Sequence, residues 1–259
     1  MSAPKVLVVL TSHDKLGETG KPTGWYLVGL FYFFLTSQSL LSTSLFSPPS
    51  SHYHHHHHHL HHQFTEVTNT TPGPNSPTPT MSSTLPPQNF IKSESTKPLF
   101  EQTRPLSEFV GNPSAIAPYS AIFFPGGHGP MYDLATSPES QQLIREFWEA
   151  GKAVASVCHG PAALVNVKLS DGTHLLKGRK VTGFTNDEEE QVGLTKVVPF
   201  LLEDKLKEAI GSEGAFEKAE QAWGEKVVVD AGGRLITGQN PASAKAVGEA
   251  LVKAVTAQK

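Results

Sequence analysis

Short apolar runs alternate with amphipathic stretches along most of the chain. Residues 5–10 (KVLVVL) are almost entirely apolar, which is typical of a parallel strand that is buried on both faces. The pattern returns later in the chain, and two of the later runs flank the turn sequence AGG, which predicts a hairpin. The further strands are predicted at residues 120–124, 152–157, 179–184, 226–230 and 234–238.

Two amphipathic stretches predict helices between and after these strands. In residues 137–151 (SPESQQLIREFWEAG), Ser137 suits the N-cap, Pro138 suits the first turn and Gly151 suits the C-terminal end. Residues 242–258 predict a final helix. Strand–helix alternation with buried strands predicts an α/β fold, a doubly wound, mostly parallel sheet flanked by helices and built as one domain.

Residues 28–63 interrupt this pattern. They hold an aromatic run, a Ser/Thr/Pro stretch and a histidine tract, and no helical period, so we expect an aberrant or low-complexity segment without a folded element. Residues 64–68 (FTEVT) could form a short strand, and residues 70–97 are a loop rich in Pro, Ser and Thr. The predicted domain therefore consists of residues 1–27 and 64–259.

The histidine tract suggests metal binding, because imidazole binds divalent metals. The tract lacks fixed geometry, so we predict no functional metal site and no cofactor. Residues 28–46 are the most lipid-like part of the chain, but Ser, Thr and Gln interrupt them, whereas a span needs about 20 mostly apolar residues. We therefore expect no membrane insertion.

Composition narrows the functional classes. A length of 259 residues suits one sizeable α/β domain, and the net charge of −3 gives no basic field for nucleic acid. A single cysteine excludes an internal disulfide and suits a reducing compartment. We expect no signal peptide, because the apolar run near the N-terminus is short. The cytoplasm is the expected location, with the nucleus as an alternative.

The strongest candidate chemistry lies at Cys158-His159-Gly160, which follows one predicted buried strand and opens a predicted helix. A thiol at a helix N-terminus gains thiolate character, and the thiolate is the reactive nucleophile. The competing interpretation is a small buried hydrophobic side chain, which is the usual role of a lone cysteine.

A second loop, Gly126-Gly127-His128, follows another predicted strand and should reach the same edge of the sheet. Its N–H groups could stabilise an oxyanion or contact substrate, although a Gly-rich loop is more often simply a tight turn. Trp25 and Tyr26 could line the substrate pocket, but packing explains such aromatics equally well.

The motifs AVASVCHGPAAL and FFPGGHGPMYDL resemble the nucleophile turn and the preceding loop of the ThiJ/PfpI superfamily, which is also called class I glutamine amidotransferase-like. The stretches KVLVVLTSHDKLGETGKPTGWYL and LITGQNPASAKAVGEAL resemble its heat-shock chaperone and glyoxalase III branch, fungal members included. The resemblance covers residues 4–27 and about 98–255. It implies a metal-free, glutathione-independent lyase of the D-lactate dehydratase type, which converts methylglyoxal to D-lactate during carbonyl stress.

The resemblance also implies roles for residues. Cys158 would form a hemithioacetal with the 2-oxoaldehyde substrate, and His159 would act as the base. An acidic residue after Gly183-Phe184-Thr185 orients that histidine in the branch, and Glu189 matches its position. The alternative, Glu188, is already explained by a capping box with Thr185.

One family feature is absent. Members of the branch carry a glutamate shortly after the motif that ends at Leu27, whereas here Val28 begins the aberrant segment. We therefore propose that residues 28–63 are foreign sequence, such as a translated intron, and expect impaired activity in the chain as written. The resemblance also implies a homodimer. Two alternative functions stay open: a holdase chaperone for unfolded clients, and an amidase, peptidase or deglycase-type hydrolase.

Overall fold

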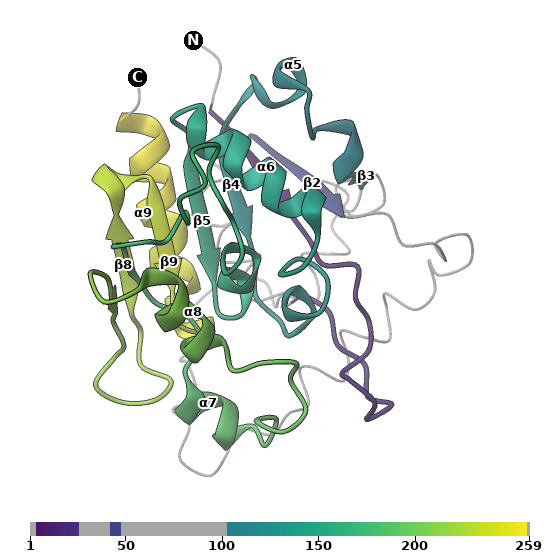
Figure 1. The fold of residues 1–259 in the computed structure, drawn as a ribbon, viewed down its shortest axis with the longest axis vertical. Coiled ribbons are helices and arrows are strands. Elements are labelled where there is room, and N and C mark those ends of the chain that lie inside the picture. The colour runs from purple at the N-terminus through teal and green to yellow at the C-terminus, as the bar shows by residue number, and fades with distance from the viewer. Residues whose placement is uncertain (1–3, 26–41, 48–102, 258–259) are drawn as a thin grey trace, which may run out of the picture.

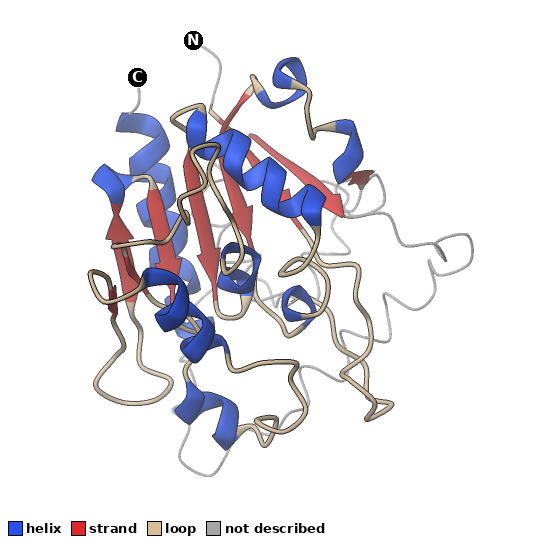
Figure 2. Ribbon diagram, viewed as in Figure 1, coloured by secondary structure: helices blue, strands red, loops and turns tan. Residues whose placement is uncertain are grey.

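A single mixed sheet of seven strands forms the centre of the protein (Figures 1 and 2). The computed structural model describes residues 4–25, 42–47 and 103–257. The strand order is β3-β2-β1-β4-β5-β9-β8, and every neighbouring pair is parallel except β8 and β9. The strands are β1 (Lys5–Val9), β2 (Ser42–Ser47), β3 (Arg104–Pro105), β4 (Tyr119–Phe124), β5 (Ala153–Val157), β8 (Val227–Asp230) and β9 (Leu235–Gly238). The predicted fold class is confirmed.

Helices cover both faces of this sheet. In Figure 1, α6 (Pro138–Glu149) lies in front of the strands and α9 (Ala244–Ala257) lies behind them. The Ser137 side chain caps α6 by accepting a hydrogen bond from the Ser140 N–H at 3.1 Å, and Gly151 follows the helix with a φ of 76°. The remaining helical elements are η2 (Leu106–Glu108), α5 (Pro113–Ile116), η3 (Gly129–Met131), η4 (Gly160–Leu164), α7 (Asn186–Gln191), α8 (Leu202–Ile210), η5 (Ala231–Gly233) and η6 (Pro241–Ser243).

The core lies between the sheet and these helices. The inner strands are buried along their length, as the apolar runs predicted, and the apolar stripe of α6 packs on β4 and β5. Burying these side chains is the main favourable term for the fold. The fully buried residues include Leu7, Ile122, Phe123, Leu143, Ile144 and Phe147.

The structure departs from the sequence prediction at β2. No folded element was expected within residues 28–63, but Ser42–Ser47 pairs in parallel with β1, from Lys5↔Ser42 to Val9↔Phe46. That prediction was wrong for these six residues. Threonine and phenylalanine favour strands, and a buried β1 with one unpaired edge would leave backbone N–H and C=O groups unsatisfied.

Two further predictions need correction. A strand was predicted at residues 179–184, but it is limited to β6 (Lys180–Val181), which pairs with β7 (Ala215–Phe216) in a separate two-stranded sheet. The segment after Cys158 was expected to open a helix, and the helix that forms there, η4, is a 3-10 helix of only five residues. The predicted hairpin is confirmed as β8 and β9.

Several predictions concern residues outside the described ones. The short strand at 64–68, the loop at 70–97 and the position of Tyr26 belong to this group, and the division into domain and aberrant segment stays a prediction. Among the described residues, no helix combines the length and apolar character that crossing a membrane requires.

Candidate active site

Cys158 occupies a sharp turn at the carboxyl end of β5. Its φ is 62°, in the left-handed region that non-glycine residues rarely adopt. Three contacts hold the turn: the Cys158 N–H donates to the Gly238 carbonyl at 2.9 Å, the Cys158 carbonyl accepts from the Phe184 N–H at 3.0 Å, and Gly160 packs against Phe124. A Cβ on Gly160 would lie 2.2 Å from the Phe124 oxygen, so only glycine fits. The surrounding structure therefore fixes a backbone conformation that costs about 1–3 kcal/mol.

The sulfur of Cys158 is buried among backbone groups and one imidazole. The residue is 6% exposed, and its Sγ lies 3.4 Å from Nδ1 of His159. The backbone N–H groups of Gly127 and His159 favour the charged form of the sulfur and so act to lower the pKa of the thiol. Gly126 lies so close that an added Cβ would come within 2.5 Å of the cysteine Cβ. The loop thus reaches the sulfur, as its position after a predicted strand suggested.

The charge state of the thiol differs from the sequence prediction. Burial raises the pKa of Cys158 to about 12, and the nearby carboxylates of Glu188 and Glu189 add to this rise, against the N–H groups of Gly127 and His159. The expected lowering of the pKa by a helix N-terminus was wrong. A 3-10 helix of five residues has a small dipole, and burial of the sulfur outweighs it.

His159 connects the thiol to a carboxylate. Its Nε2 lies 2.7 Å from Oε2 of Glu189, and both side chains are almost fully buried. Burial lowers the pKa of His159 to about 4, and His128 contributes to the lowering, while the Glu189 carboxylate opposes it. A neutral ring that donates from Nε2 to Glu189 keeps Nδ1 as the acceptor for the thiol proton. The three residues therefore form a continuous chain from thiol to imidazole to carboxylate.

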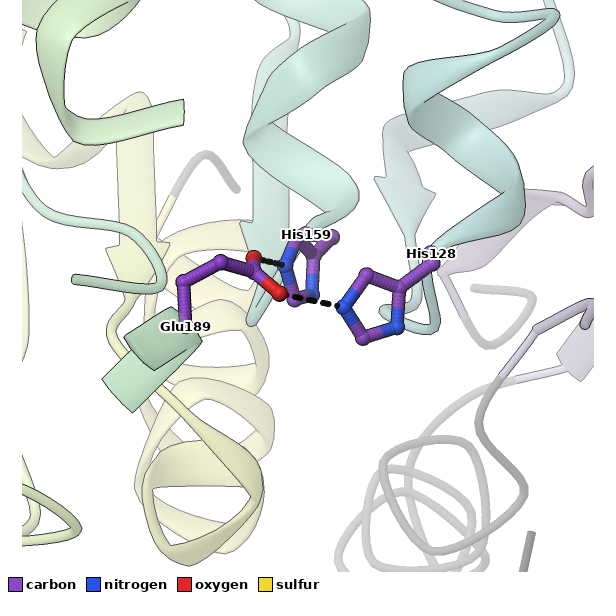
Figure 3. Close-up of side chains that lie close together, drawn as sticks. All are labelled: His128, His159 and Glu189. Atoms are coloured by element: carbon purple, nitrogen blue, oxygen red, sulfur yellow. Dashed lines mark hydrogen bonds and ion pairs between the residues drawn. The ribbon is translucent and has the colours of Figure 1, made fainter. Parts of the chain in front are cut away.

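Glu189 also contacts a second histidine, His128, and so bridges two imidazole rings (Figure 3). Nε2 of His128 lies 2.9 Å from Oε1 of Glu189, and the two ring centroids are 4.0 Å apart. Burial opposes ionisation of Glu189, but hydrogen bonds from both histidines outweigh it and lower its pKa to about 2. The sequence placed His128 with the glycine loop and did not predict this pairing. The three side chains also form a cluster with the spacing of possible metal ligands.

The neighbouring Glu188 makes structural hydrogen bonds to residues other than the two histidines. Its Oε2 completes a capping box by accepting from the Thr185 N–H and hydroxyl, both at 2.9 Å. Its Oε1 accepts from the Trp223 N–H at 2.8 Å, the Gln239 side chain at 2.9 Å and the Asn240 side chain at 2.8 Å. Sequence reasoning identified the cap but missed these distant donors, because they lie 35 to 52 residues further along the chain.

Two aromatic predictions can be located only in part. Trp25 is half-buried and packs against the core, while Tyr26 lies outside the described residues. Next to Trp25, the Gly24 carbonyl accepts a hydrogen bond from the Gly129 N–H at 3.2 Å, which places this segment beside the glycine loop. The sequence did not indicate that Phe184 packs at the site, where its ring centroid lies 4.3 Å from that of His159.

Comparison with known proteins gives related sequences. The family model described as the DJ-1/PfpI family matches residues 114–254, more than half of the chain. Glyoxalase 3 of Candida albicans is 33% identical over 138 residues, which cover 52% of this chain and 58% of that protein. The protein/nucleic acid deglycase HchA of Escherichia coli is 29% identical over 156 residues, which cover 60% of this chain and 53% of HchA. The aligned segments thus span little more than half the length of these curated relatives.

Solved structures share the fold. The Rapid Encystment Protein 24 KDa of Francisella tularensis superposes with a TM-score of 0.78 at 28% sequence identity, covering 97% of this chain and 99% of that one. Glyoxalase III of Candida albicans superposes with a TM-score of 0.71 at 24% identity, covering 97% of each chain, and this likeness concerns the fold alone.

Proposed function

We propose, since the chain belongs to the DJ-1/PfpI family, that it is a glutathione-independent glyoxalase that converts methylglyoxal to D-lactate. The observation that carries the proposal is the chain of contacts from the Cys158 sulfur through His159 to Glu189. Relatives at 32–33% identity are named as glyoxalases of this kind. The catalytic roles of the three residues are part of the proposal.

The first step is addition of the thiol to the substrate aldehyde. The S–H proton moves to Nδ1 of His159 while the sulfur bonds to the aldehyde carbon, and the proton then passes to the aldehyde oxygen, giving a hemithioacetal. Because the thiol is neutral at pH 7, this step needs a base in contact with it, and Nδ1 of His159 is 3.4 Å away. The Glu189 carboxylate stabilises the imidazolium that forms.

The second step moves a proton between two substrate carbons. His159 takes the proton from the carbon that carries sulfur and delivers it to the adjacent carbonyl oxygen, which gives an enediol. The hydroxyl on the sulfur-bearing carbon then loses its proton while the neighbouring carbon gains one, which gives a lactoyl thioester. Water then cleaves the carbon–sulfur bond, which releases lactate and restores the thiol. N–H donors of Gly127 and His159, which lie at the sulfur, are near the charge that develops during hydrolysis.

A lactate assay with methylglyoxal, without glutathione or added metal, tests this function. Cys158→Ser should reduce D-lactate formation to background, and His159→Gln should reduce it by about 10²–10⁴-fold, the usual contribution of a positioned base. Glu190→Gln, which changes an exposed carboxylate one residue from Glu189, serves as the matched control and should retain turnover. Undiminished lactate formation by Cys158→Ser would eliminate the nucleophile.

A hydrolase that uses the same thiol is the second candidate, because HchA, named as a deglycase, is also similar to this chain. The same variants would abolish hydrolysis of glycated substrates, so the substrate profile of the wild type decides between the two. A holdase role is tested in parallel, since Cys158→Ser should still suppress aggregation of an unfolded client if that role exists. A homodimer and a cytoplasmic or nuclear location remain predictions.

A further inference from the structure

We infer that His128, His159 and Glu189 form a binding site for a zinc-like divalent transition metal ion, and that the bound ion disables the thiol–imidazole–carboxylate chain. One ligand atom from each residue lies within 4.8 Å of the other two. The ligands come from three elements that meet at one edge of the sheet: the loop before η3, the turn after β5, and α7 (Figure 3). The site is therefore built by the fold and not by neighbours in sequence.

The donor set suits zinc. Two imidazole nitrogens and one carboxylate oxygen, with a fourth position left for water, are a common arrangement around Zn²⁺. The carboxylate contributes one negative charge against the two charges of the ion, while His159 and His128 supply nitrogen donors. Both rings already point Nε2 at the same carboxylate, at 2.7 and 2.9 Å. An ion at about 2.0–2.2 Å from each ligand would replace these two hydrogen bonds after a small withdrawal of the Glu189 side chain.

The rings are oriented before an ion arrives. The His159 ring contacts both His128, at a centroid distance of 4.0 Å, and Phe184, at 4.3 Å. Ligands held by surrounding groups bind metal more tightly than mobile ones. Access is through His128, whose side chain is 19% exposed, whereas those of His159 and Glu189 are 1% and 3% exposed. The histidine on the open side of the cluster is thus the first ligand that an ion would meet.

Metal binding and the proposed catalysis exclude one another. The ion takes Nε2 of His159 and the carboxylate of Glu189, which are the two atoms that make up one link of the catalytic chain. The sulfur of Cys158 contacts the opposite nitrogen of the ring, Nδ1, so it is not a ligand. Zinc would therefore inhibit turnover without covering the thiol. This inhibition rests on the proposed function, whereas binding of the ion does not.

The test measures Zn²⁺ binding directly. The full chain is used with the nine histidines at positions 52, 54–59, 61 and 62 replaced by serine, which removes competing imidazoles. Competition with a chromophoric chelator should give one ion per chain. His128→Gln and Glu189→Gln should each weaken binding by at least about 10–100-fold, while Glu190→Gln and Cys158→Ala should leave it unchanged. Unchanged affinity in both ligand variants, or lost affinity in Cys158→Ala, overturns the site.

Spectroscopy of the bound ion gives a second test that does not depend on whether the ligand variants fold. Co²⁺ added to the same serine-substituted chain should give ligand-field bands without a sulfur-to-metal charge-transfer band. A sulfur band, or no saturable binding at all, overturns the proposal. Because neither readout uses turnover, a chain that binds zinc but makes no lactate in the absence of the ion contradicts only the proposed function. A chain that makes lactate but does not bind zinc contradicts only this site.

Discussion

At the scale of single residues, two opposing effects set the protonation state of the Cys158 thiol: burial raises its pKa, and local dipoles lower it. The rise of its pKa from 9.0 to about 12 corresponds to about 4 kcal/mol. A helix N-terminus contributes about 0.3–1 kcal/mol in the other direction. The effect of burial on the pKa is larger than that of the helix N-terminus. The residue therefore stays a neutral thiol at pH 7 and depends on His159 to take its proton during attack.

Alkylation of Cys158 should therefore be slow at neutral pH and accelerate steeply with base. Only the thiolate reacts, and a thiol with a raised pKa loses its proton at higher pH, so the rate should rise about tenfold for each pH step of one from 7 to 9.5. At pH 7 it should lie about 10³-fold below that of a free thiol, given the difference in pKa. Iodoacetamide labelling followed by mass spectrometry measures this rate without ambiguity, because the chain has a single cysteine.

A free thiol compound labelled in the same buffers is the control for the pH dependence of the reagent. Circular dichroism at each pH shows that the fold persists through the range. A plateau of the protein rate below pH 9 would contradict the raised pKa and would restore the dipole-activated thiolate that the sequence suggested.

The residues of the site differ in how far the sequence could reveal them. Cys158 and His159 are adjacent, and an apolar strand before them and a Gly-Pro after them mark a turn, so local pattern sufficed to select them. Glu189 lies 30 residues further on and was chosen by family resemblance, although the structure brings it within 2.7 Å of His159. His128 was selected only as part of the glycine loop, since its contact with Glu189 spans 61 residues and no local pattern encodes it.

At the scale of elements, helices and strands that are specified by their own residues were predictable, whereas those that depend on contacts with distant segments were not. The helix α6 carries its own signals, an N-cap serine, a first-turn proline and a closing glycine, and it forms as predicted. In contrast, β2 forms where composition indicated no element, because its partner β1 supplies the hydrogen bonds that hold it. The expected helix after Cys158 shortens to η4, whose residues are all buried against neighbouring elements.

The helix α7 should depend on Glu188 for stability. The carboxylate is fully buried and accepts hydrogen bonds only, from Thr185, Trp223, Gln239 and Asn240. In Glu188→Gln an amide NH₂ replaces one acceptor oxygen and leaves donors unpaired, at about 1–3 kcal/mol for each buried group. We expect a loss of at least about 2 kcal/mol in the free energy of unfolding, measured by urea denaturation.

The matched control is Glu190→Gln, which alters an exposed carboxylate on the same helix and should change stability by less than about 0.5 kcal/mol. Because α7 also carries Glu189, the Glu188 variant should lower lactate formation as well, through displacement of the carboxylate from His159. Equal unfolding free energies for the two variants would show that the buried hydrogen bonds around Glu188 are not a support for this helix.

At the scale of the whole molecule, residues 28–63 differ in composition from the rest of the chain, yet they contribute one strand, β2, to its sheet. Backbone hydrogen bonds between β1 and β2 do not depend on side-chain identity, so a foreign segment can supply a strand where the sheet edge requires one. The glutamate that the family resemblance leads us to expect after Leu27 cannot be supplied this way, because a side chain at a fixed position depends on the sequence. We therefore predict that the strand is present while the chemistry expected of the same segment is lost.

Replacing residues 28–63 with the corresponding segment of Candida albicans Glyoxalase 3 should therefore raise both stability and turnover. On the hypothesis drawn from the family resemblance, the repaired chain would regain an acidic residue near Cys158, together with a helical segment suited to one face of the sheet. We expect a higher midpoint of thermal unfolding and a higher rate of D-lactate formation from methylglyoxal. Cys158→Ser in the repaired chain is the control that ties any gained activity to the same thiol. Equal turnover in the original and repaired chains would refute the foreign-segment hypothesis for function, and a transcript that encodes residues 28–63 in frame would refute it for origin.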